Sequence, residues 1–266
     1  MADFKKDVQP KVQKAAPKDT SWNGVALWYD DLLESNTGTY QADLILPNVL
    51  RLLGVKAGEA VFDLACGQGF FSREIFKAGA RVTGVDLSPK LIELAKTRSP
   101  KEIKFFAAPA DKFPFLPDAS FEKVVCILAI QNIKNVAGAL AESVRVLKRG
   151  GRFLMVMNHP AFRIPKRSSW GTDPIKKIQY RRVDEYISES ESAIEMHPGL
   201  EVEANTVSFH RPLQFYFKAL SKAGFAVTRL EEWTSNKQSQ PGPAANMENK
   251  ARKEFPLFLA LEAVKL

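Results

Sequence analysis

The stretch VFDLACGQGFFS, Val61–Ser72, is typical of a buried strand, a glycine turn and the start of a helix. Open α/β sheets use this order to present backbone N–H groups to a ligand at the carboxyl end of a strand. A dinucleotide-binding fingerprint would need glycine or alanine where the chain has Ser72. Asp63, at the strand end, would repel a pyrophosphate and attract a cation. The turn therefore predicts a ligand with positive charge near Asp63.

Strand-like runs and helical patterns alternate on both sides of this turn, which predicts a doubly wound, mostly parallel α/β sheet of seven strands. The first five strands are expected at 60–65, 81–86, 103–108, 123–129 and 152–157. Two helices are expected before the turn. Later helices are expected from Phe70, from Pro89 with Ser88 as the cap, and from Val136 to the pair Gly150–Gly151. A closing helix ending at Gly224 and two terminal strand-like runs, AVTRLEEW and FPLFLALEAVKL, complete the pattern.

The alternation stops after Met157, so the chain divides into four expected segments. Residues 1–20 form a basic tail with too little apolar content to pack, and we expect it to be disordered. Residues 21–158 form a ligand-binding core with N-terminal helices, and residues 159–212 form an acceptor-binding cap inserted after the fifth strand. Residues 213–266 return to the core as the closing helix and terminal strand pair.

Composition and charge narrow the class of protein. The 266 residues have a formal charge of +8, 45% hydrophobic residues and no apolar run long enough for a membrane span. The N-terminus lacks the apolar core of a signal peptide, so a cytoplasmic protein without a membrane partner is expected. Cys66 and Cys126 have no metal-ligand spacing, and no metal is expected. The cationic stretch 145–182 adjoins the acidic stretch 184–203, which suggests that the two face one another.

Two further acids follow strand ends. Asp86 ends the run RVTGVD, where a carboxylate can accept hydrogen bonds from both hydroxyls of a ribose; capping the next helix is the alternative role. Asp111, in AAPAD, stands where an adenine amino group could donate to it, or it is an exposed turn acid. Three acids at three successive strand ends around one glycine turn favour a nucleoside ligand with a cationic part.

These motifs resemble class I S-adenosylmethionine-dependent methyltransferases, and the chain is similar to the ubiquinone-type small-molecule branch. The resemblance covers about 25–160 and lies in DLACGQG, VTGVDLS, PADKFPF, FEKVVCILAIQNI and RVLKRGGRFLMVMNHP. It implies S-adenosylmethionine as cofactor, with Asp63 near its ammonium and Asp86 on its ribose.

The resemblance also implies the rest of the cofactor site. Asp111 would lie by the adenine, Gly67 and Gly69 would allow the backbone to approach, and Ala65 stands where many members have a first glycine. The remaining expected contacts are Leu87, Ala129 and Tyr29. Tyr29 and its neighbour Trp28 could close over the cofactor or pack a helix on the sheet.

Methyl transfer is an in-line displacement, so alignment can supply much of the catalysis. Gln131, after the fourth strand, is the candidate polar residue at the reaction centre, or else a surface amide. His159, directly after the fifth strand, is the candidate base, or else it caps its loop. The candidate acceptor-binding residues are Arg163, Tyr180, His210 and Arg211. Ion pairs with the acidic half of the cap are the alternative for the arginines, and a turn position is the alternative for His210.

The sequence therefore predicts a methyltransferase for a small molecule, with anionic or aromatic acceptors as candidates. The positive charge supports an RNA or other nucleic-acid methyltransferase as an alternative, but AIQN at 129–132 lacks the Asn/Asp-Pro-Pro-aromatic motif of adenine-N6 enzymes. A non-catalytic S-adenosylmethionine-binding protein is the second alternative. The oligomeric state is left open.

Overall fold

A computed structural model describes residues 22–23, 26, 30–31, 38–195 and 205–266. The predictions for the tail at 1–20, for Trp28 and Tyr29 and for residues 196–203 of the acidic stretch lie outside these residues.

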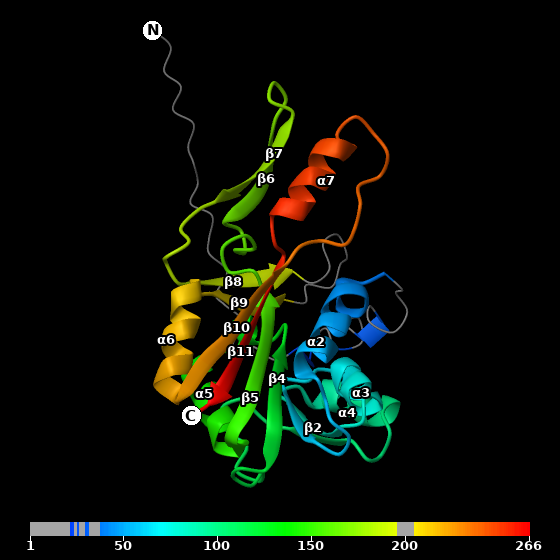
Figure 1. Cartoon of the computed structure of the whole chain (residues 1–266), viewed down its shortest axis with the longest axis vertical. Coiled ribbons are helices and arrows are strands. Elements are labelled where there is room, and N and C mark those ends of the chain that lie inside the picture. Colours follow the sequence, from blue (N-terminus) through cyan, green and yellow to red (C-terminus); the bar gives the residue numbers. More distant parts are fainter. Residues whose placement is uncertain (1–21, 24–25, 27–29, 32–37, 196–204) are drawn as a thin grey trace.

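The described chain is built on a seven-stranded sheet in the order β10-β11-β5-β4-β1-β2-β3 (Figure 1). Its strands are β1 (Ala60–Leu64), β2 (Arg81–Asp86), β3 (Lys104–Ala107), β4 (Phe121–Ile127), β5 (Leu147–Asn158), β10 (Phe225–Trp233) and β11 (Phe258–Lys265). The ladders among β1 to β5 are parallel, and β11 runs antiparallel to both of its neighbours, β5 and β10. The predicted fold class and the terminal strand pair are confirmed.

Helices cover both faces of this sheet, as Figure 1 shows. One apolar cluster joins the sheet to η2 (Gln41–Ile45), α2 (Leu46–Leu53), α3 (Phe70–Lys77) and α4 (Pro89–Arg98), and the other joins it to α5 (Val136–Val146) and α6 (Leu213–Ala223). In β1, Val61 belongs to the first cluster and Phe62 to the second, and both are fully buried. A central parallel strand is covered on both sides, which explains its nearly continuous apolar sequence.

Two residues that the sequence predicts at helix ends, Ser88 and Gly224, have these positions in the structure. Ser88 caps α4, because its hydroxyl accepts a hydrogen bond from the N–H of Leu91 at 3.2 Å. Gly224 ends α6 in the left-handed conformation, with φ at +96°.

The helix expected to reach Gly150–Gly151 is shorter than predicted. It ends at Val146, and Leu147 already pairs with Phe121 as part of β5. The ladder shifts register near this point, and a Cβ on Gly151 would lie 2.8 Å from the carbonyl oxygen of Lys148. The glycine pair therefore permits a tight backbone path within β5, and pairing with β4 overrides the local helical pattern.

The segment after β5 holds two hairpins that lie outside the main sheet. They are β6 (Ser168–Asp173) with β7 (Ile178–Val183), and β8 (Ser190–Glu195) with β9 (Asn205–His210). A further helix, α7 (Ala245–Glu254), packs beside the β6–β7 hairpin at one end of the molecule (Figure 1). None of these elements was expected from the sequence. The strands β6 and β7 have many exposed side chains, and α7 buries only Ala251, so the apolar periodicity of these segments is weak.

Candidate cofactor and acceptor site

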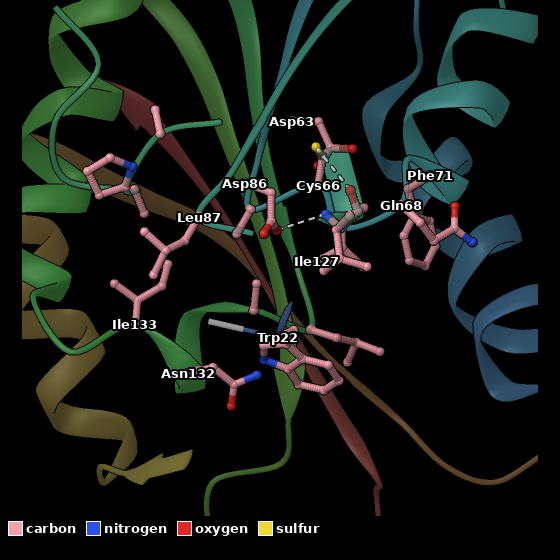
Figure 2. A pocket seen from close by; sticks show the side chains of 18 of the residues that line it. Trp22, Asp63, Cys66, Gln68, Phe71, Asp86, Leu87, Ile127, Asn132 and Ile133 are labelled. Atoms are coloured by element: carbon pink, nitrogen blue, oxygen red, sulfur yellow. Dashed lines mark hydrogen bonds between the residues drawn. The ribbon is translucent and has the colours of Figure 1, made fainter. Parts of the chain in front are cut away.

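A cavity of about 350 Å³ lies at the carboxyl ends of β1, β2 and β4 (Figure 2). This volume is within the range of small-molecule sites. Seven predicted cofactor residues line it: Asp63, Ala65, Gly67, Asp86, Leu87, Asp111 and Ala129. The structure thus brings together residues that are up to 66 positions apart in the chain, although contact with a cofactor remains a prediction for each.

Asp63 is the second-last residue of β1 and is only 2% exposed. The hydroxyl of Ser72 donates a hydrogen bond to its carboxylate at 2.6 Å. Burial raises the pKa of Asp63 to about 7, the Ser72 hydrogen bond opposes this rise, and the negative charge of Asp86 adds to it. A buried carboxylate without a cationic neighbour is unstable in its charged form, so the site favours a ligand that brings a positive charge.

The glycine turn and Asp86 hold one another in place. The N–H groups of Gly67 and Ser88 donate to the two carboxylate oxygens of Asp86 at 2.9 and 2.8 Å, and Figure 2 shows the first of these bonds. Burial raises the pKa of Asp86, while these two backbone hydrogen bonds lower it. Because a carboxylate has about four acceptor positions, Asp86 keeps acceptor capacity for ribose hydroxyls.

The backbone of the turn is left-handed at three positions, with φ of +60° at Ala65, +58° at Gly67 and +82° at Gly69. Gly69 does not line the cavity. A Cβ at this position would lie 3.0 Å from the ring of Phe105 in β3, so this glycine lets α3 approach the sheet closely. The structure therefore gives Gly69 a packing role, and its predicted role at the cofactor stays a prediction.

Asp111 is held at the cavity wall by the start of α5. The side-chain amide of Asn135 donates to its carboxylate at 2.7 Å, while the side-chain Oδ1 of Asn135 accepts from the N–H of Gly138 and caps the helix. A Cβ on Gly138 would lie 2.5 Å from the Asn135 amide nitrogen and 2.8 Å from Cβ of Asp111. The missing side chain at Gly138 makes this arrangement possible.

The chain after β4 turns sharply at Leu128, whose φ is +56°. Strained non-glycine residues of this kind concentrate at functional sites. Gln131 does not line the cavity, since its amide donates to the carbonyl oxygen of Leu128 at 2.7 Å and its side chain is buried. Asn132 lines the cavity instead, one residue from the predicted position.

Several lining residues were not singled out from the sequence. Trp22 lies across the cavity from Asp63 in Figure 2, Gln68 lies in the turn before α3, and Phe71 lies in the first turn of α3. Trp22 stands in a polar segment without a motif, so only the folded chain could place it here. Cys66 also lines the cavity, where burial raises the pKa of its thiol well above the ordinary value, which argues against a reactive thiolate.

The histidines proposed for the acceptor site lie apart from this cavity. His159 is 4% exposed, its Nε2 pairs with Glu232 at 2.7 Å, and its Nδ1 accepts from the N–H of Ala161 at 3.2 Å. These contacts match the alternative role of a loop cap. His210 is also buried, and its Nε2 lies 2.8 Å from the carbonyl oxygen of Tyr186. Burial lowers the pKa of both histidines.

The other acceptor candidates occupy different places. Tyr180 is exposed and packs across β6 over Gly171. Arg211 is 6% exposed, donates from Nη2 to the carbonyl oxygen of Lys134 at 2.9 Å, and stands over two phenylalanine rings. Lys134 lines the first cavity, whereas Arg211 does not. Arg163 lines a second cavity of about 260 Å³.

The arginines of the cap divide into two groups. Three form ion pairs with the acidic stretch as expected: Arg167 with Glu185, Arg182 with Asp184, and Arg211 with Glu189. Arg163 and Arg181 have no carboxylate partner among the described residues.

Comparisons with known proteins show that the chain is similar to methyltransferases. Residues 62–155 match the family model described as a methyltransferase domain. A demethylmenaquinone methyltransferase from Tropheryma whipplei is 37% identical over 113 residues, which are 41% of this chain and 46% of that protein. The chain therefore spans about half the length of the curated relatives it matches.

Solved structures extend the agreement to most of the fold. An S-adenosylmethionine-dependent methyltransferase from Mesorhizobium loti has a TM-score of 0.68 and 27% identity, and the match covers 85% of this chain and all of that one. The glycopeptide N-methyltransferase MtfA, solved with S-adenosylmethionine, has a TM-score of 0.58 at 18% identity, with 84% of this chain and 93% of that chain covered. The latter shows a shared fold alone. The chain therefore contains a methyltransferase domain at residues 62–155, and its fold is that of S-adenosylmethionine-dependent methyltransferases.

Proposed function

We propose that the protein transfers a methyl group from S-adenosylmethionine to a small-molecule acceptor. The observation that carries this proposal is one cavity in which Asp63, Asp86 and Asp111 surround the glycine turn. The domain match and the relatives named as quinone methyltransferases support the same reaction class.

The residues fit the cofactor by charge and by hydrogen-bonding capacity. Bound S-adenosylmethionine supplies an electrophilic methyl group on a sulfonium. Asp63 would offer its buried carboxylate to the cofactor's ammonium, whose charge would favour the ionised form of the acid. Asp86 would accept from the ribose hydroxyls, and Asp111 from the adenine amino group. In these roles the chain positions the cofactor and replaces its water, so that alignment lowers the barrier.

The cavity walls favour an acceptor that is already nucleophilic. No histidine lines the cavity among the described residues, and the thiol of Cys66 is held in its neutral form. An acceptor that arrives as an anion needs no protein base. Lys134 supports this reading, because it lines the cavity close to Asn132 and carries a positive charge. The finer proposal is therefore an anionic acceptor near Asn132 and Lys134.

The proposal is tested by supplying methyl-labelled S-adenosylmethionine with either the small-molecule or the nucleic-acid fraction of a cell extract. We expect label in the small-molecule fraction, with or without ribonuclease. Label confined to ribonuclease-sensitive material would instead establish the nucleic-acid alternative. Cofactor binding without label transfer to any fraction would favour a non-catalytic binding protein.

Asp86→Ala should weaken cofactor binding by about 1.5–3 kcal/mol, roughly ten- to a hundredfold, because hydrogen bonds to a charged group are lost. Calorimetric titration measures this change. Glu93→Ala, an exposed acid of α4, removes the same charge outside the cavity and is the matched control. Thermal unfolding of both variants shows whether the turn survives, and unchanged affinity in a folded Asp86→Ala protein would remove Asp86 from the ribose site.

A further inference from the structure

The second cavity, of about 260 Å³, lies between the β6–β7 hairpin, α7 and the segment that leads into β11. Figure 1 shows the hairpin and α7 side by side in this region. The cavity shares no lining residue with the cofactor cavity. Its walls combine three arginines, four aromatic residues and no acid: Tyr40, Phe162, Arg163, Trp170, Arg181, Ser235, Arg252, Phe255, Pro256 and Leu257.

The three arginines of this cavity are held by neutral groups. Arg163 donates to the side-chain carbonyl oxygen of Asn158 at 2.7 Å. Arg181 donates to the carbonyl oxygen of Phe162 at 2.8 Å and to the hydroxyl of Ser168 at 2.7 Å. None of the three guanidinium groups, Arg252 included, forms an ion pair with a carboxylate of the residues that the structure describes. Other cap arginines do, so the missing acid is specific to this cavity.

The positive charges of these arginines are not neutralised by a carboxylate of the described residues, and Arg163 and Arg181 are partly buried. Burial lowers the pKa of Arg163, and the nearby charge of Arg181 lowers it further, while Tyr40 acts in the opposite direction. Lys237 adds another cation, 4.7 Å from the centre of the Tyr40 ring. Buried charges are normally paired, so a cluster of cations around a cavity points to an anionic ligand.

The aromatic side chains give the cavity an apolar wall. Trp170 and Phe255 meet edge to face with ring centres 5.3 Å apart, and Phe162 meets Phe255 in the same way at 5.5 Å. Arg181 stands 5.1 Å from the centre of the Trp170 ring, which fixes the plane of its guanidinium beside that wall. An apolar wall with adjoining arginines suits a ring that carries a negative charge.

We propose that this second cavity binds a small aromatic anion, whose carboxylate or phosphate is held by Arg163 and Arg181 and whose ring packs against Trp170 and Phe255. The site is independent of the methyl-transfer proposal, because it is formed by other residues and is tested by binding alone.

Calorimetric titration of the full-length protein with benzoate and phenyl phosphate tests the proposal and separates the two anionic groups. We expect at least one of them to bind at least tenfold more tightly than benzamide, which has the ring without the charge, and than acetate or inorganic phosphate, which have the charge without the ring. Arg181→Gln should weaken that binding at least tenfold. Arg182→Gln is the matched control, because Arg182 is the next residue of β7, is exposed and pairs with Asp184; it should bind within twofold of the parent.

S-adenosylmethionine titration of the same variants shows whether each is folded, independently of the second cavity. The proposal is overturned if neither aromatic anion binds, if benzamide binds as tightly as both, or if Arg181→Gln and Arg182→Gln behave alike while both bind cofactor. Binding of inorganic phosphate as tight as that of phenyl phosphate, with no benzoate binding, would also overturn it, because the ring would then contribute nothing.

Discussion

At the residue scale, the protonation of Asp63 links pH to cofactor binding. Burial raises its pKa to about 7, so both the protonated and the ionised form are populated near neutral pH. A cationic ligand requires the ionised form, so we expect affinity for S-adenosylmethionine to fall about tenfold from pH 8 to pH 6. Calorimetry across this range measures the change.

The same acid sets a pH dependence of stability. A pKa raised in the folded state means that folding takes up a proton. The contribution of Asp63 to the stability of the unliganded protein is therefore present at low pH and is lost as the pH rises toward about 7.

The variant Asp63→Asn tests the role of this acid in cofactor binding. It should bind cofactor weakly at pH 8 and show little pH dependence of binding. A parent-like pH profile in this variant would assign the titration to another group.

Ala65 is a second residue whose effect can be measured alone. Its φ of +60° costs a residue with a Cβ about 1–2 kcal/mol, while a glycine would lose about 0.5–1 kcal/mol through greater freedom in the unfolded chain. Ala65→Gly should therefore stabilise the protein by about 0.5–1 kcal/mol, measured by urea unfolding. Ala95→Gly, inside α4, should destabilise it by a similar amount. A loss of stability in Ala65→Gly would show that the alanine methyl group packs usefully.

At the element scale, the start of α5 controls the adenine side of the cavity. Gly138→Ala would place a methyl group against Asn135 and Asp111 and break their 2.7 Å hydrogen bond. We expect the Kd for S-adenosylhomocysteine to rise about three- to tenfold, or roughly 0.7–1.4 kcal/mol, although alanine is the better helix former. Gly242→Ala, where a Cβ would lie 4.0 Å from the carbonyl oxygen of Gln240 and clash with nothing, is the control. Equal affinity in both variants would mean that Asp111 does not contribute to binding.

At the scale of the whole molecule, the formal charge of +8 is spread among local contacts. Basic residues of the core and cap pair with acids from several elements, as Arg145 does with Asp118 and Glu142, and Arg182 with Asp184. Among the described residues no helix is long and apolar enough to cross a membrane. The charge therefore does not by itself identify a polyanionic partner.

Salt dependence tests this conclusion. A protein that makes six to ten phosphate contacts loses about 10³–10⁵ in affinity between 50 and 200 mM salt. We expect any binding to an RNA oligonucleotide to be weak, and cofactor affinity to change less than about tenfold over this range. Fluorescence anisotropy measures the first quantity and calorimetry the second. Tight RNA binding with a steep salt slope would favour the nucleic-acid alternative.

The sequence by itself determined the sheet, its two-sided helical cover and seven of the residues that line the first cavity. These follow from local signals: apolar runs of strand length, the Ser88 cap, and acids or glycines at strand ends, whose carboxyl edges a parallel sheet brings together. The family resemblance added the identity of the cofactor.

Only the tertiary structure decided the end of α5, the cap hairpins and the surroundings of the acceptor candidates. Val146 ends its helix because β5 pairs with β4, a non-local interaction that helix propensity does not record. His159 and Gln131 follow the expected strands, yet neighbouring groups bind their side chains away from the cavity. Arg163, Arg181 and Arg252 are far apart in sequence, and their shared cavity exists because α7 and the β6–β7 hairpin pack together. Side-chain direction and long-range packing depend on the whole fold, which a sequence period or motif cannot specify.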